Sequence, residues 1–229
     1  MRSFAIIFLN VFILFYAQIT AAAQIISCPT NKVCIRYTNS ENIELALNAI
    51  RKVYDFFINY GYSETYFLEV VFQENVVVES CSGDLIRVIG KLGKDNRIYL
   101  TNRHEPWLKK QNAYGLEMSK EFYESLIVHE VAHFITEKII GRKIEPSRSE
   151  YIAYVVQFSQ MQPQMKQAIL NQSFLPAFKT YQISLDIMLL DPAVFAVKSY
   201  LHFKEDKGQF LKKILSNATF GDQNERLLE

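Results

Sequence analysis

The sequence predicts an α+β fold in which a small N-terminal mixed sheet packs on a helical C-terminal half. Two observations lead to this prediction. Segments rich in β-branched and aromatic residues all lie before residue 104, and from residue 119 onward every segment has helical periodicity. Strands first and helices later are typical of α+β domains rather than of alternating α/β folds. The 229 residues, 49% of them hydrophobic, are enough for one well-packed domain.

The first 23 residues have the pattern of a cleaved signal peptide. Arg2 supplies a basic start, FAIIFLNVFILFYA an apolar run, and residues 21–23 the small side chains of a cleavage site. The alternative is a membrane anchor, for which the run is short beside the roughly 20 residues that a span needs. We therefore expect residues 1–23 to be a signal peptide, residues 24–229 to be one mature domain, and the location to be secreted or periplasmic.

The charge balance of the mature chain argues against polyanionic partners. The full sequence has a formal net charge of +1, and removal of Arg2 leaves 24 basic and 24 acidic residues. Nucleic-acid-binding proteins usually have a basic excess or a basic stripe. We therefore expect neither nucleic-acid binding nor a stable association with membranes after signal cleavage.

Export would place the three cysteines in an oxidising compartment. Cys28 and Cys34 close the short loop CPTNKVC and are one plausible disulfide. The other option pairs Cys34 with Cys81 and leaves Cys28 free or lipidated. Lipidation is the weaker idea, because a lipid-attachment cysteine directly follows the apolar run and Cys28 comes later.

The first half of the mature chain predicts strands around one helix. Helical spacing of apolar residues in residues 40–62, with a stop at Gly61, predicts that helix. Residues 104–118 have no period and predict a loop, which either covers a cleft or forms a surface Ω-loop. The expected strands cover residues 33–39, 65–80, 85–90 and 96–103.

The second half predicts a series of helices. The first is long, covers residues 120–140 and ends at Gly141, and the next begins at Ser147. The remaining three cover residues 164–172, 191–203 and 208–217. In the helix from residue 191, Asp191 is the expected N-cap and Pro192 the first helical residue.

The segment VHEVAHF, residues 128–134, contains the candidate site. His129 and His133 project from one face of the predicted helix, so both rings can reach one ion. Glu130 lies about 100° around the helix, within reach of a water on that ion. Zinc lowers the pKa of such a water, and a carboxylate can accept the proton. The alternative is a buried pair of core histidines satisfied by hydrogen bonds, since the flanking residues are apolar on every side.

A catalytic zinc takes three protein ligands, so a third residue is needed. Glu150 begins the next helix, which must pack against the first, and is the best candidate. The competing interpretation of SRSE, residues 147–150, is a capping box in which Glu150 binds the backbone N–H of Ser147. Glu145, in the connecting turn, is the other possible carboxylate ligand. Glu137 lies on the same helix as the histidines and cannot fold back onto the ion.

His129-Glu130-x-x-His133, followed by Glu150 in an E-x-x-A-Y setting, resembles the gluzincin branch of the zincin metallopeptidases. The resemblance covers roughly residues 65–216, and the motif is its specific part. It implies a zincin-like fold with a buried active-site helix, and hydrolysis of peptide or protein substrates. It also implies one Zn²⁺ per chain on His129, His133 and Glu150, with Glu130 as general base. The alternative is a catalytically inactive zincin-fold binding protein.

The sequence departs from the thermolysin-like pattern at Tyr154. Those enzymes place an aspartate four residues after the ligand glutamate, where it supports a ligand histidine. A different group must therefore orient the histidine here.

A peptidase also needs a donor for the developing oxyanion, and the candidates are Tyr200 and His202. Tyr200 lies on an inward stripe and is preferred, with a core tyrosine whose hydroxyl is satisfied as the alternative. His202 shares a polar face with Lys198 and Glu205, so we expect it to be solvated. The resemblance further implies that an extended peptide binds along an edge strand just before the active-site helix, which in this sequence is NRIYLTN, residues 96–102. The alternative is that this segment is an ordinary strand of the sheet.

Overall fold

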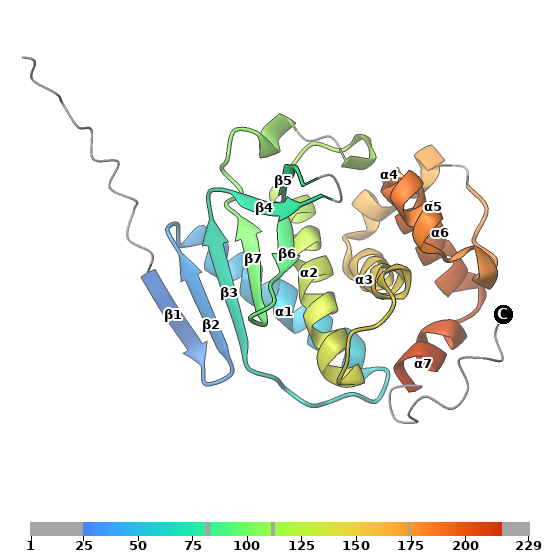
Figure 1. The fold of residues 1–229 in the computed structure, drawn as a ribbon, viewed down its shortest axis with the longest axis horizontal. Coiled ribbons are helices and arrows are strands. Elements are labelled where there is room, and N and C mark those ends of the chain that lie inside the picture. The colour runs from blue at the N-terminus through green and yellow to red at the C-terminus, as the bar shows by residue number, and fades with distance from the viewer. Residues whose placement is uncertain (1–24, 81–82, 111–112, 174, 217–229) are drawn as a thin grey trace, which may run out of the picture.

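The computed structural model describes residues 25–80, 83–110, 113–173 and 175–216 (Figure 1). The expected signal peptide and Cys81 lie outside these ranges. Within the described residues, none of the helices combines the length and the apolar character that crossing a membrane requires.

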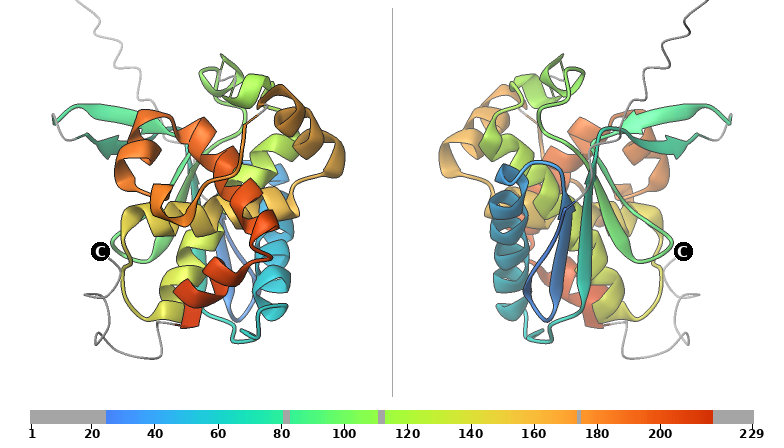
Figure 2. Two further views of the ribbon diagram at one scale, coloured as in Figure 1. Left: turned by 90° about the vertical axis from the view of Figure 1, so that its right-hand side faces the viewer. Right: turned by 90° about the vertical axis from the view of Figure 1, so that its left-hand side faces the viewer.

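The N-terminal half forms a five-stranded mixed sheet and a separate hairpin, so an α+β architecture is confirmed. The sheet order is β1 (Ile25–Thr30), β2 (Val33–Tyr37), β3 (Leu68–Gln73), β7 (Arg97–Thr101) and β6 (Gly90–Leu92). The three central strands run parallel, and β1 and β6 are antiparallel edges. Strands β4 (Val76–Glu79) and β5 (Leu85–Val88) form the hairpin, which projects from the body of the molecule (Figure 2).

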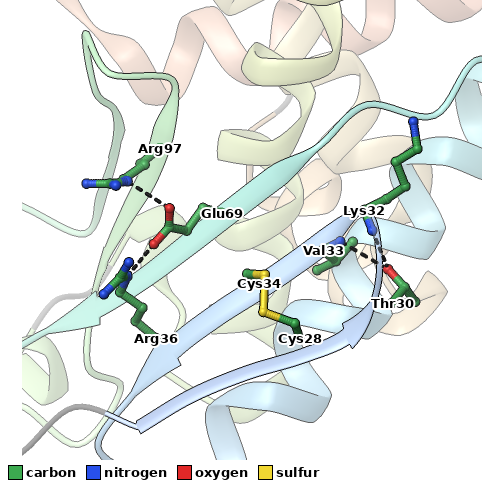
Figure 3. The surroundings of a disulfide bond; sticks show 8 residues. All are labelled: Cys28, Thr30, Lys32, Val33, Cys34, Arg36, Glu69 and Arg97. Carbon is green, nitrogen blue, oxygen red and sulfur yellow. Dashed lines mark hydrogen bonds and ion pairs between the residues drawn. A yellow bond between two sulfur atoms is a disulfide. The ribbon is translucent and has the colours of Figure 1, made fainter.

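Two cross-strand links hold the outer part of the sheet. A Cys28–Cys34 disulfide joins β1 to β2 (Figure 3), which confirms the first of the two expected pairings and excludes a free or lipidated Cys28. Glu69 on β3 lies between Arg36 on β2 and Arg97 on β7, and its carboxylate is 2.8 Å from Nε of Arg97 and also contacts Arg36. This ion-pair network connects the three parallel strands on their polar face.

Helices pack on the apolar face of this sheet and continue into the C-terminal half (Figure 2). One cluster of buried side chains contains Val70 and Ile98 from the sheet, Leu45 from α1 (Glu41–Ile58) and Val131 from α2 (Lys120–Ile140). The remaining helices are α3 (Pro146–Gln160), α4 (Pro163–Ser173), α5 (Leu185–Leu190), α6 (Pro192–Glu205) and α7 (Gln209–Ser216). Short 3₁₀ turns cover Leu108–Lys110, Ala113–Gly115 and Thr180–Gln182.

The predicted ends of α2 and the predicted start of α6 are confirmed, whereas α6 continues to Glu205, two residues beyond its predicted end. The N-cap Ser119 accepts a hydrogen bond from the N–H of Phe122 at the start of α2. Gly141 ends α2 with φ of 73°, a left-handed conformation that glycine adopts without steric cost. Asp191 caps α6 by accepting from the N–H groups of Ala193 and Val194.

The prediction that residues 96–102 form the sheet edge is wrong. Strand β7, within that segment, is interior, between β3 and β6. The edge strand is β6, because the predicted strand 85–90 divides at Ile89. Residues 85–88 pair with β4, whereas Gly90 begins a strand that pairs antiparallel with β7.

The prediction that His202 is solvated is also wrong. His202 is only 5% exposed, and its Nδ1 lies 3.0 Å from the hydroxyl of Tyr151. Its Nε2 lies 3.2 Å from the hydroxyl of Thr180. The reason is tertiary: α7 follows α6 closely, and its Phe210 packs edge-on against the His202 ring, with centroids 5.6 Å apart.

Candidate metal centre

Helices α2 and α3 pack against each other and bring the three predicted ligand residues together. His129 and His133 come from α2, and Glu150 comes from the first turns of α3. The two Nε2 atoms are 3.1 Å apart. Oxygens of Glu150 lie 3.2 Å from Nε2 of His129 and 3.4 Å from Nε2 of His133. The two rings meet different oxygens of the carboxylate. One ligand atom from each of the three residues thus forms a triangle whose sides are at most 4.8 Å.

The ligand atoms of this cluster are close enough together to hold one metal ion. Zinc bonds of about 2.1 Å in a tetrahedron place neighbouring ligand atoms about 3.4 Å apart. The separation of the two Nε2 atoms, and that of each Nε2 from one Glu150 oxygen, are close to this value, with a different oxygen facing each ring. The exposed fractions of the side chains are 11% for His129, 14% for His133 and 28% for Glu150. Two imidazole nitrogens and one carboxylate oxygen are also a donor set that zinc prefers in catalytic sites.

The hydrogen bonds in the first turn of α3 show that Glu150 does not form a capping box with Ser147. The N-cap of α3 is Glu145, whose carboxylate accepts hydrogen bonds from the N–H groups of Ser147 and Arg148 at 3.0 Å each. It also contacts the hydroxyl of Ser147. The alternative of a capping box between Ser147 and Glu150 is therefore excluded, and α3 begins at Pro146 rather than at Ser147, where the sequence predicted its start. With Glu145 engaged as the cap, Glu150 is left to face the histidines.

Glu150 and His133 each favour the charged form of the other. Burial alone would raise the pKa of Glu150, but hydrogen bonds and charges of His129 and His133 outweigh burial and hold this pKa far below its usual range. Burial alone would lower the pKa of His133, but hydrogen bonding to Glu150 outweighs it and raises this pKa. The three groups thus present a carboxylate between two imidazoles, an arrangement that a cation stabilises.

Side chains of α3 hold the far nitrogen of each ring. Nδ1 of His129 is 3.2 Å from Oε1 of Gln157, and Nδ1 of His133 is 2.9 Å from the hydroxyl of Ser149. The ring of Tyr154 packs on the ring of His129, with centroids 4.5 Å apart. Gln157 and Ser149 were not predicted from the sequence as partners of the histidines. Helical spacing was the available signal for Gln157, seven residues after Glu150.

Glu130 lies against the backbone of the edge strand. A Cβ placed on Gly90 of β6 would be 2.6 Å from Cγ of Glu130, closer than side chains approach. Burial raises the pKa of Glu130, an effect that the charges of His129 and His133 partly oppose. The predicted base is thus on the same helix as the two histidines and beside the sheet edge.

The structure places Tyr200 in a second buried cluster. Its ring stacks on Phe158 at 5.5 Å, and Nζ of Lys166 lies 5.4 Å from its centroid. Tyr114 of the 3₁₀ turn Ala113–Gly115 packs edge-on against Phe158 in the same region. These contacts show a packing role for Tyr200, and its participation in catalysis stays a prediction.

Fold and site together define an α+β protein with a cluster of two histidines and one glutamate that could hold a metal ion. The chain belongs to DUF6639, a family of unknown function, whose profile matches residues 36–224. This range includes the helices α2 and α3 that form the cluster. No curated protein and no solved structure matches the chain.

Proposed function

We propose that the protein is an exported, zinc-dependent metallopeptidase of gluzincin type. The observation that supports this most directly is that His129, His133 and Glu150 bring one ligand atom each to within 4.8 Å of one another, the three-ligand set of a catalytic zinc site. The position of Glu130, one residue after the first histidine and against the edge strand, adds the second required group. An antiparallel edge strand beside the motif helix, and a third ligand on the next helix, support a zincin-like fold.

Each residue has a defined role in the proposed reaction. His129, His133 and Glu150 hold the ion, and Glu130 is the general base. When bound, zinc would lower the pKa of a water molecule and polarise the substrate carbonyl. Glu130 accepts the proton of the attacking water and delivers it to the departing amide nitrogen. The raised pKa of Glu130 suits a group that must accept a proton and then release it.

The edge strand β6 supplies the proposed substrate-binding surface. Its Gly90–Leu92 backbone pairs with β7 on one side, and an extended peptide can add to the other side by main-chain hydrogen bonds. Gly90 has no side chain to separate such a peptide from Glu130. This arrangement would carry a peptide bond past the base and the ligand triangle.

One observation favours a second candidate, an inactive zincin-fold binding protein. Tyr200, the candidate donor to the oxyanion, packs on Phe158 in the second cluster. A binding protein would retain zinc without hydrolysing peptides. Zinc content and hydrolysis of a broad peptide mixture, measured on the mature wild type and on Glu130→Gln, separate the two candidates, because a peptidase loses hydrolysis and keeps zinc in that variant.

A further inference from the structure

A buried chain of hydrogen bonds connects His129 to the backbone of its own helix through α3. Nδ1 of His129 lies 3.2 Å from Oε1 of Gln157. Nε2 of Gln157 donates to the hydroxyl of Ser125 at 3.2 Å, and that hydroxyl donates to the carbonyl of Phe122 at 2.7 Å. Both Gln157 and Ser125 are buried, so water does not compete for these groups.

The direction of this chain follows from its fixed end. The carbonyl of Phe122 can only accept, so the Ser125 hydrogen is used there and Ser125 must accept from its other neighbour. The amide nitrogen of Gln157 therefore points to Ser125, and its oxygen points to His129. An amide oxygen only accepts, so Nδ1 of His129 must be protonated. Nε2, which faces Glu150, carries a proton when it donates to that carboxylate. When the ring is neutral, as a metal ligand must be, Nε2 instead has a free lone pair that faces the ligand triangle.

The second histidine has a neutral partner as well. The hydroxyl of Ser149 lies 2.9 Å from Nδ1 of His133, and Ser149 directly precedes the ligand Glu150. The partners of both rings are thus an amide and a hydroxyl. A carboxylate partner would make an imidazole a stronger ligand than these neutral groups do.

We propose that Gln157, held by Ser125, is the positioning residue that fixes the tautomer and orientation of His129 for metal binding. This proposal rests on the proposed function to the extent that it assumes a metal at the three ligands. Gln157 takes the supporting role that the sequence at Tyr154 leaves open, because Tyr154 contacts the ring face of His129 and Gln157 meets its nitrogen. Because Gln157 is a neutral partner of His129, its replacement by a carboxylate can increase the zinc affinity of the site.

The test measures zinc affinity of the mature protein by competition with a chromophoric chelator. Gln157→Leu removes the acceptor and should weaken binding about 10- to 100-fold. Gln157→Glu keeps an acceptor toward His129 and should bind zinc at least as tightly as wild type. Ser125→Ala should cause a smaller loss than Gln157→Leu. The matched control is Gln164→Leu, at an exposed position of α4, which should leave affinity unchanged.

A second readout identifies the tautomer directly. Nitrogen-15 spectra of histidine-labelled, zinc-loaded protein should show a protonated Nδ1 on His129 in wild type and in Gln157→Glu. In Gln157→Leu that proton should exchange faster with solvent. Thermal unfolding of each variant separates loss of fold from loss of affinity.

The outcomes distinguish the two levels of the proposal. Absence of zinc binding in wild type would overturn the metal centre and with it this inference. Zinc binding by wild type, with Gln157→Leu within twofold of it, would overturn the role of Gln157 and leave the proposed function standing.

Discussion

Glu130 on α2 packs directly against Gly90 on β6, so closely that a Cβ on Gly90 would lie 2.6 Å from Cγ of the glutamate. The same Cβ would lie 2.9 Å from the side chain of Leu100 on β7. An alanine at position 90 could therefore not relieve the contact with Glu130 by moving toward Leu100. The edge strand therefore fixes where the proposed base lies, and it does so through the absence of a side chain.

Gly90→Ala should displace Glu130 without removing any ligand. Displacement of a reacting group by about 1 Å can cost on the order of 100-fold in rate, so we expect a loss of peptide hydrolysis of that order. Zinc content should stay at the wild-type level, because His129, His133 and Glu150 are unchanged. Peptide hydrolysis near the wild-type rate in Gly90→Ala would show that Glu130 is not the base or that β6 moves to accommodate the added methyl group.

Glu145 and Glu150 should respond differently to substitution, although both are candidate carboxylates by sequence. Glu145→Ala removes the cap of α3 and should cost about 0.5–2 kcal/mol in the free energy of unfolding, with zinc retained. Glu150→Gln should strongly weaken zinc binding. Chemical denaturation and zinc titration of both variants test this pair, and zinc loss in Glu145→Ala alone would place the third ligand in the turn.

The buried His202 should make the fold sensitive to mild acid. Burial lowers its pKa below the ordinary value of 6.5, although Asp206 and Glu205 partly oppose this effect. The unfolded chain therefore binds the proton more readily, and stability should fall as pH drops from about 6.5 through the lowered folded pKa. His202→Gln should show a smaller stability loss between pH 7.5 and 5.5. The contribution of His133 is the same in wild type and in His202→Gln. The difference between their curves of stability against pH therefore reports on His202 alone. Parallel curves would contradict the assignment.

The sequence predicts the elements of the site better than their surroundings. The ends of α2 and α6 follow from local signals, the Gly141 stop and the Asp191 cap, and the ligand spacing on α2 follows from helical geometry. The order of strands depends on pairing between distant segments, which is why the edge was assigned to residues 96–102 rather than to β6. Likewise, local pattern could not show that α7 covers His202.

The first turn of α3 shows a second limit. Serine is a common N-cap, and SRSE has the form of a capping box, which was the alternative to a ligand role for Glu150, yet Glu145 before Pro146 caps the helix instead. Two carboxylates five residues apart compete for the same role, and only their positions in three dimensions decide between them. The same holds for Gln157, whose partner His129 is 28 residues away in sequence.

Glu130→Gln tests the chemistry separately from the metal. The amide has nearly the shape of the carboxylate but cannot accept the proton of the attacking water. Peptide hydrolysis should fall by orders of magnitude while zinc is retained. Glu137→Gln, at a carboxylate two turns further along α2, is the matched control and should keep most of the activity. Equal rates in wild type and Glu130→Gln would exclude the proposed role of the base.

The most direct measurement is the metal content of the mature protein, purified without chelators and analysed for all first-row transition metals. The account predicts about one zinc per chain, the stoichiometry of a single three-ligand site, and loss of that zinc in His129→Ala and in His133→Ala. Wild-type protein that holds no zinc and cannot be loaded with it would contradict the account, and the two histidines would then be core residues paired with Glu150.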